Sequence, residues 1–259
     1  MENLTDLAFV VSSETLALLI VAAFVAGFVD SIAGGGGLIT VPALLLAGVP
    51  PVTALATNKV QGLFGAAMAA INYARAGHVD LARQWASALL SFAGAVCGAL
   101  LAASLPTDVI RIGLPFLLIA IALFFAFKKG LGDLDRAQRM TPFLFGLTVV
   151  PAIGFYDGML GPGTGAFFMI AFVGLAGFGV LKATAHTKLL NFASNVGGLA
   201  GFLLVTSPLW ALGLAMGAAQ IAGAYIGSKL ATKIGAGLIK PVLVVTSTAL
   251  AVKLLSEWL

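Results

Sequence analysis

The chain carries one motif twice, first as Gly27-Phe-Val-Asp30-Ser-Ile-Ala-Gly34-Gly-Gly36 and again as Gly154-Phe-Tyr-Asp157-Gly-Met-Leu-Gly161-Pro-Gly163. Five of the ten positions are identical, the aspartate among them. In each copy glycine interrupts an apolar segment, and an acidic residue stands just before the interruption. Paired, interrupted hydrophobic segments in the two halves of a membrane protein are typical of a transporter binding site.

The composition of the chain indicates that both copies lie in lipid. Of the 259 residues, 60% are hydrophobic and only 9% are charged, whereas a soluble domain has about 25% charged residues. Apolar stretches of about 18 residues or more recur throughout, as in a polytopic helical membrane protein. The net charge of +4 comes from residues in short connections, where Lys and Arg set orientation, so we expect no nucleic-acid partner.

We predict two sets of five apolar segments. The first set lies at 14–32, 38–49, 53–74, 84–104 and 109–127, and the second at 142–160, 164–178, 183–206, 209–230 and 239–256. The fold class is therefore an all-α integral membrane protein built from a tandem repeat with glycine-broken helices. One membrane domain would comprise a first repeat at 1–130, a cytoplasmic connection at 131–141 and a second repeat at 142–259.

The segments 38–49 and 164–178 are too short for an upright span. At 1.5 Å per residue the first covers about 18 Å, less than the roughly 30 Å hydrocarbon core. Each is either a tilted short span or half of a re-entrant hairpin.

The positions of Lys and Arg predict the orientation. Placing four connections in the cytoplasm satisfies the positive-inside rule, and it puts both termini on the periplasmic side. The cationic residues of those connections are Arg75, Arg83, Lys128, Lys129, Arg136, Arg139, Lys182, Lys229, Lys233 and Lys240. An odd number of segments per repeat inverts the second half relative to the first, as in many secondary transporters.

The glycine breaks are candidates for contact with a small anion. Glycine lets the backbone approach a ligand, and the helices that follow would present free N–H groups and a positive dipole end. The candidate residues are Gly34, Gly35, Gly36, Gly37, Gly161, Gly163 and Thr164. The alternative is that these glycines only permit a tight turn.

Two pairs of charged residues occupy matching positions in the repeats. Asp30 and Asp157 lie in apolar surroundings, where a carboxylate is a functional candidate by default. They would carry a proton, cap the backbone at the break or pair with a lysine. Lys59 and Lys188 align after a two-residue insertion, and they would either contact an anion or snorkel to the interface.

A stripe of small and polar residues follows these lysines on one helical face in both repeats. We expect substrate contact from Asn58, Gln61, Thr187 and Asn191. The rest of the stripe is more typical of a close helix–helix interface. A metal site is not expected, because His186 has no second ligand near it in the sequence. Without a nucleophile motif, P-loop or dinucleotide fingerprint, we expect no catalytic residue, no cofactor and no enzyme activity.

The first motif, continued as Leu38-Ile-Thr-Val-Pro42-Ala-Leu and followed by Ala54-Leu-Ala-Thr-Asn-Lys59, resembles the sulfite exporter TauE/SafE family of bacterial membrane proteins. The resemblance covers essentially the whole chain, although the second motif is looser: Pro162 and Thr164 interrupt its glycines, and Met169 replaces Pro42. It implies a multi-pass protein of the bacterial inner membrane that moves small sulfur-containing anions such as sulfite or organosulfonates.

The sequence therefore predicts a secondary transporter in the lipid bilayer that exports a small sulfur-containing or organic anion by alternating access. The membrane potential would drive an anion outward with about 2.3 kcal/mol per charge per 100 mV. Anion uptake coupled to protons and an anion channel are the alternatives. The identity of the anion stays open, and so does the oligomeric state, for which a homodimer is one option.

Overall fold

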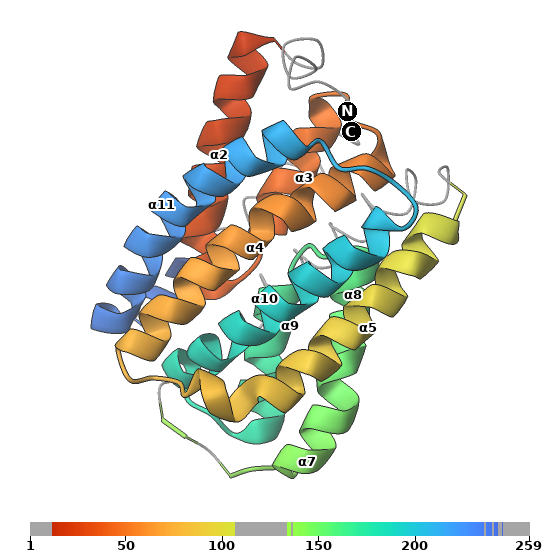
Figure 1. Ribbon diagram of the computed structural model, residues 1–259. Coiled ribbons are helices and arrows are strands. Elements are labelled where there is room, and N and C mark those ends of the chain that lie inside the picture. Colours follow the sequence, from red (N-terminus) through yellow and green to blue (C-terminus); the bar gives the residue numbers. More distant parts are fainter. Residues whose placement is uncertain are drawn as a thin grey trace.

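The computed structural model describes residues 12–106, 134–135, 137–235, 237–239, 241–242 and 245. The elements named within these ranges are all helices (Figure 1). The α-helices are α2 (Ser13–Ala33), α3 (Gly37–Leu46), α4 (Pro51–Arg75), α5 (Trp85–Ser104), α7 (Pro142–Leu144), α8 (Val150–Met159), α9 (Thr164–Ala171), α10 (Val180–Leu203) and α11 (Trp210–Ile234). The 3-10 helix η1 (Leu81–Gln84) precedes α5, and π-helical turns follow α7 and α9 as η2 (Phe145–Val149) and η3 (Phe172–Ala176).

The prediction of an all-α membrane protein is confirmed for the described residues. Four continuous helical stretches are long and apolar enough to cross a bilayer: Ser13–Ala33, Leu81–Ser104, Pro142–Met159 and Trp210–Ile234. The ends of the predicted segments lie within four residues of the ends of the observed helices. The segment 109–127 and most of 239–256 lie outside the described residues, as do both chain termini.

The two short segments are the returning arms of hairpins. Helix α3 turns back after α2 and brings Leu44 into one buried cluster with Leu19, near the start of α2. The second hairpin does the same, because the Phe172 ring in η3 lies 4.8 Å from the Phe145 ring near the start of that hairpin. Both bends, at Gly34–Gly37 and Gly161–Gly163, therefore lie inside the protein.

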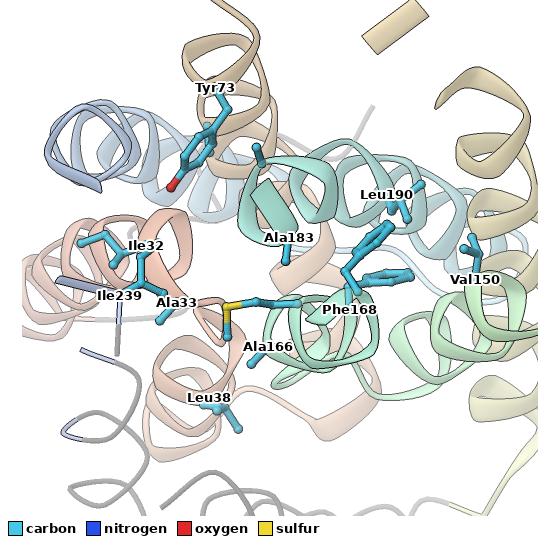
Figure 2. Close-up of a cluster of buried hydrophobic side chains, with 14 of the residues drawn as sticks. Ile32, Ala33, Leu38, Tyr73, Val150, Ala166, Phe168, Ala183, Leu190 and Ile239 are labelled. Carbon is cyan, nitrogen blue, oxygen red and sulfur yellow. The ribbon is translucent and has the colours of Figure 1, made fainter. Parts of the chain in front are cut away.

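Helices α4 and α10 cross in opposite directions between the two hairpins (Figure 1). Gly62 faces Asn195 and Lys59 faces Gly198. Residue numbers therefore rise along α4 as they fall along α10, and the two helices are antiparallel. The main hydrophobic cluster holds the second hairpin against α10, with Phe168 of α9 beside Leu190 (Figure 2). The polar residues of α4 and α10 are thus enclosed by the more apolar helices around them.

The two ends of the bundle differ in chemistry. At one end, which we call the cationic end, lie the termini of helices and connections that carry Arg75, Arg83, Arg139, Lys182, Lys229 and Lys233. At the opposite end, which we call the aliphatic end, a buried cluster joins α2, α3, α4 and α11 through Leu19, Ala23, Leu44, Val49, Ala54, Leu212 and Met216. Helices α2, α4 and α11 begin near the aliphatic end, whereas α5, α8 and α10 begin near the cationic end.

The central connection is attached to α10 at the cationic end. Asp135 Oδ1 accepts a hydrogen bond from the backbone N–H of Gly179, the N-cap of α10, at 2.7 Å. Asp135 Oδ2 forms an exposed ion pair with Lys182 at 2.9 Å. The hydrogen bond from Lys182, together with that from Gly179, holds the pKa of Asp135 below its ordinary value.

Glycine allows the outer helices to approach the backbone of their neighbours. Helix α2 packs along α11 and α8 along α5. A methyl group on Gly158 of α8 would lie 1.8 Å from the carbonyl oxygen of Ala95 in α5. Small residues at such crossings are the usual means of close helix packing in lipid.

We predict that Gly158→Ala lowers the thermal stability of the purified protein in detergent. Overpacking of this kind costs about 1–3 kcal/mol or more. Gly174→Ala is the matched control, since no described atom lies within 4 Å of a methyl group there. In a helix, that change is expected to be neutral or to stabilise by about 0.5–1 kcal/mol. Equal melting shifts for the two variants would contradict the packing argument.

Candidate functional site

The two glycine bends meet at the centre of the protein. Gly34 has φ +79°, and a methyl group on it would lie 2.2 Å from the backbone nitrogen of Ala166. Gly37 approaches Pro162 in the same way, with 3.2 Å between an added methyl group and the Pro162 Cα. Helices α3 and α9 begin at this junction, so two N-terminal helix ends with their positive partial charge point toward one place.

A small cavity of about 30 Å³, lined mostly by buried residues, lies at the junction, which is room for about two water molecules. Ten of the residues selected from the sequence line it: Asp30, Gly35, Gly36, Gly37, Asn58, Asp157, Gly161, Gly163, Thr164 and Asn191. We call it the central cavity. Its lining comes from both hairpins and from α4, α10 and α11, so residues far apart in sequence converge on it.

Each buried lysine pairs with the aspartate of the other half of the chain. Lys59 Nζ lies 2.8 Å from Asp157 Oδ1, and both side chains are almost fully buried, with exposed fractions of 1% and 3%. Lys188 Nζ lies 3.5 Å from Asp30 Oδ2. Each lysine also donates to the backbone carbonyl of its aspartate. The lysines thus do not line the central cavity themselves but contact the two aspartates that do.

The aspartates also hold the glycine bends. Asp30 Oδ1 accepts a hydrogen bond from the backbone N–H of Gly36 at 3.1 Å. The Thr164 hydroxyl lies 2.9 Å from Asp157 Oδ1 and 2.7 Å from the Gly161 carbonyl oxygen, so its single proton is shared between these two acceptors. Both structural roles left open by the sequence, capping of the break and pairing with lysine, are therefore present. Asp157 Oδ2 is buried and has no hydrogen-bond partner among the described residues.

Four other selected residues lie around the cavity without lining it, in addition to Gly34. Lys59 and Lys188 form the crossed ion pairs. Gln61 donates from Nε2 to Asn58 Oδ1 at 3.1 Å, and Thr187 donates to the Ala183 carbonyl at 2.8 Å within α10. Gln61 and Thr187 thus support the helices that carry the lining residues.

Four lining residues were not among the predicted contact residues, namely Gly62, Gly165, Asn195 and Gln220; Gly62 belongs to the predicted polar stripe and Gly165 to the second glycine break. Asn195 follows Asn191 by one helical turn, and its Nδ2 donates to Asn191 Oδ1 at 3.2 Å, so the i, i+4 spacing was a usable signal. Gln220 lies in α11, whose sequence gave no sign that it faces the centre.

A larger cavity of about 450 Å³ lies at the cationic end. We call it the end cavity. Its lining combines polar and aromatic side chains, including His78, Arg83, Gln84, Phe172, Phe178 and His186. Gln84 Nε2 and His186 Nδ1 are 2.6 Å apart, and the His186 ring packs against Phe172 and Phe178. His186 lines the end cavity and Asn191 the central cavity, and these two residues are about 7.5 Å apart along the axis of α10.

Among the described residues, no group of three or more His, Cys, Asp or Glu side chains is placed to hold a metal ion. The chemistry that the central cavity offers consists of backbone N–H groups, amides, a hydroxyl and two carboxylates paired with lysines.

Comparison with known sequences assigns the family. The profile of the sulfite exporter TauE/SafE family matches residues 19–254. The chain belongs to this family. It is 60% identical over 252 residues to "Probable membrane transporter protein ORF9" of Sinorhizobium sp, with 97% of this chain and 95% of the relative covered. It is 46% identical to "Probable membrane transporter protein YfcA" of Escherichia coli K12, with 99% and 95% covered.

A more distant relative, "Probable membrane transporter protein YunE" of Bacillus subtilis, is 24% identical over 84% of this chain and 87% of its own length. No solved structure matches the chain. The family assignment confirms the resemblance found from the motifs, and together with the helices it makes the chain a multi-pass membrane protein.

Proposed function

We propose that this TauE/SafE protein is a secondary transporter that moves a small sulfur-containing or organic anion, of the sulfite or organosulfonate type, through the central cavity by alternating access. The observation that carries the proposal is the meeting of two glycine-broken hairpins at one small polar cavity. Irregular backbone at membrane depth is tolerated where it lines a cavity, and two helix N-termini there favour an anion. The family description favours export as the direction.

The proposal includes two inverted repeats, residues 1–130 and 142–259. Matching packing supports it: Gly27 of α2 faces the Gln220 carbonyl, and Gly154 of α8 faces the Ser91 carbonyl. The next motif residue repeats the pattern, because the carbonyl of Phe28 faces Gly227 and that of Phe155 faces Gly98. In both interfaces the two contacts on the partner helix are seven residues apart. The antiparallel crossing of α4 and α10 supports the inversion.

Alternating access is supported by the contrast between the two ends. The aliphatic end is filled by side chains of α2, α3, α4 and α11, whereas the end cavity hollows the cationic end. The positive-inside rule assigns the cationic end to the cytoplasm. In this assignment the structure is closed on the periplasmic side, and the end cavity is the cytoplasmic vestibule of the transport path.

The small volume of the central cavity supports a carrier rather than a channel. A channel needs a continuous pore with weak binding along it, but the central cavity has room for about two waters. A sulfonate or sulfite must therefore enlarge it by moving the hairpins. The residues proposed to meet the anion are the lining glycines with Asn58, Thr164 and Asn191.

The test is flux into liposomes that contain the purified protein. Labelled sulfite, thiosulfate, ethanesulfonate, sulfate and lactate form the panel. We expect saturable flux and counterflow for at least one sulfur-containing anion. Flux that does not saturate would indicate a channel, and an absence of protein-dependent flux for every anion would overturn the proposal.

We predict that Asn191→Ala lowers the saturable flux about tenfold or more, because a lost hydrogen bond to a charged ligand costs about 1.5–3 kcal/mol. Asn72→Ala is the matched control: Asn72 is also buried, but it bonds to Ser228 at 2.8 Å, away from the central cavity. Its flux per folded molecule should stay near the wild-type value. Equal losses in both variants would remove Asn191 from the proposed site.

A further inference from the structure

The charges at the central cavity already balance. Within the described part of the chain, Asp30 and Asp157 line the cavity, and Lys188 and Lys59 pair with them. The sum of these formal charges is zero, so the lysines offer no surplus positive charge to a substrate. A monoanion that entered would leave one uncompensated negative charge in a buried site. Such a charge is costly unless it is neutralised, and protonation of a carboxylate is the usual means.

The structure distinguishes between the two carboxylates. The Oδ1 atom of Asp157 receives both Lys59 Nζ at 2.8 Å and the Thr164 hydroxyl at 2.9 Å. Its Oδ2 atom is buried and has no partner in the described ranges. In Asp30, by contrast, Oδ1 accepts from the Gly36 N–H and Oδ2 faces Lys188. A protonated carboxyl has one O–H donor, and Asp157 Oδ2 is the oxygen free to carry it.

Other titratable groups near Asp157 are already engaged. The Tyr156 hydroxyl donates to the Pro162 carbonyl at 2.6 Å, and the Tyr73 hydroxyl beside Asp30 donates to the Ser31 carbonyl. From α4 the charged group facing Asp157 is Lys59, and from α9 the facing group is the Thr164 hydroxyl. Gly158, the residue after Asp157, contacts Ala95 of α5 and Gly198 of α10, and neither of these residues has a titratable side chain. The described histidines that line a cavity, His78 and His186, belong to the end cavity.

We propose that each anion crosses together with one proton carried on Asp157 Oδ2; this inference rests on the proposed function. Water at the open side supplies the proton to Oδ2, which becomes an O–H group and donates a hydrogen bond to an oxygen of the anion. Lys59 keeps its contacts with Oδ1 and the backbone carbonyl. After the hairpins open to the other side, the anion leaves and the proton returns to water. Cotransport of a monoanion and a proton moves no net charge, so the membrane potential does not drive it. Export by this route requires an outward anion gradient that is larger than any inward proton gradient.

The experiment uses the full-length protein in liposomes that enclose a pH-sensitive dye. The probes are the five panel anions, and ethanesulfonate is the decisive one where it is carried, because it stays a monoanion at every pH used. We expect anion entry to acidify the lumen, and a one-unit pH gradient to change steady-state accumulation about tenfold. A 100 mV potential should leave that accumulation unchanged, whereas a monoanion moving alone would respond about 50-fold.

Asp157→Asn keeps the shape of the side chain but cannot carry the proton, and Asp30→Asn is the matched variant. We expect Asp157→Asn to abolish lumen acidification. Asp30→Asn should carry the anion more slowly, because Asp30 lines the central cavity and pairs with Lys188, but it should still move one proton with each anion carried. If the wild-type protein carries a panel anion without acidification and with a full response to voltage, the proton inference is wrong and the transport function stands. If Asp30→Asn alone abolishes acidification, the assignment to Asp157 is wrong. If no panel anion is carried at all, the proposed function itself fails.

Discussion

Replacing Lys59 by alanine is expected to lower the free energy of unfolding by about 3–5 kcal/mol, because the change leaves a buried carboxylate without its counter-ion. The Lys59 and Asp157 side chains are 1% and 3% exposed, so the carboxylate loses its counter-ion in a site with little access to bulk water. The loss should appear as a lower melting temperature in detergent and a smaller monodisperse fraction in size-exclusion chromatography. Transport per folded molecule should be measured separately.

The control for Lys59→Ala is Lys182→Ala, which removes an ion pair of nearly the same length, 2.9 Å, whose partners are 44% and 56% exposed. Exposed pairs contribute about 0.2–1 kcal/mol. Adding Asp157→Ala to Lys59→Ala should recover part of the stability, since the uncompensated charge is removed, and the coupling between the two sites should be about 0.5–3 kcal/mol. Equal losses for Lys59→Ala and Lys182→Ala would show that burial does not matter here.

Gly34→Ala is expected to prevent the two bends from meeting and to reduce the folded yield about tenfold or more. Gly34 has φ +79° and ψ 165°, a region open essentially to glycine alone. An added methyl group would also lie 2.2 Å from Ala166 N and 2.4 Å from the carbonyl carbon of Gly165. These neighbours are backbone atoms, so no side-chain rotation relieves the contact. The yield of monodisperse protein is the measurement.

The matched variant for this substitution is Gly77→Ala. Gly77 has the same φ of +79°, but no described atom lies within 4 Å of a methyl group built there. It should therefore show only the backbone cost of about 1–2 kcal/mol. If Gly34→Ala folded as well as Gly77→Ala, the close contact of the two bends would be absent in the membrane.

Most of the helical plan could be predicted, because lipid imposes long apolar stretches and glycine marks their interruptions. The motif at Gly27–Gly36 also located the central cavity, because an aspartate in an apolar membrane segment is costly and therefore indicates a functional site. The π-helical turns were not predicted. Pro151 lacks an N–H and contributes to the irregularity near η2. No residue pattern in the sequence, however, distinguishes a π-helical turn from an α-helical one.

The partners of the charged residues also could not be predicted from the sequence. Lys59 and Asp30 lie in the same half, yet in the structure each bonds to the opposite half. Sequence spacing shows which residues share a helix face, but the choice of partner depends on how α4 and α10 cross. The same limit hid Gln220, whose place at the central cavity depends on the packing of α11 against α2 and α4.

The exchange of ion-pair partners between the halves has a consequence for biosynthesis. When the first half has entered the bilayer and the second is still on the ribosome, Lys59 and Asp30 lack the partners of the finished protein. A charged residue at the centre of a membrane helix costs about 2.5–3.5 kcal/mol on insertion scales. The first half alone therefore carries two charges without these partners, and the arrival of the second half relieves that cost.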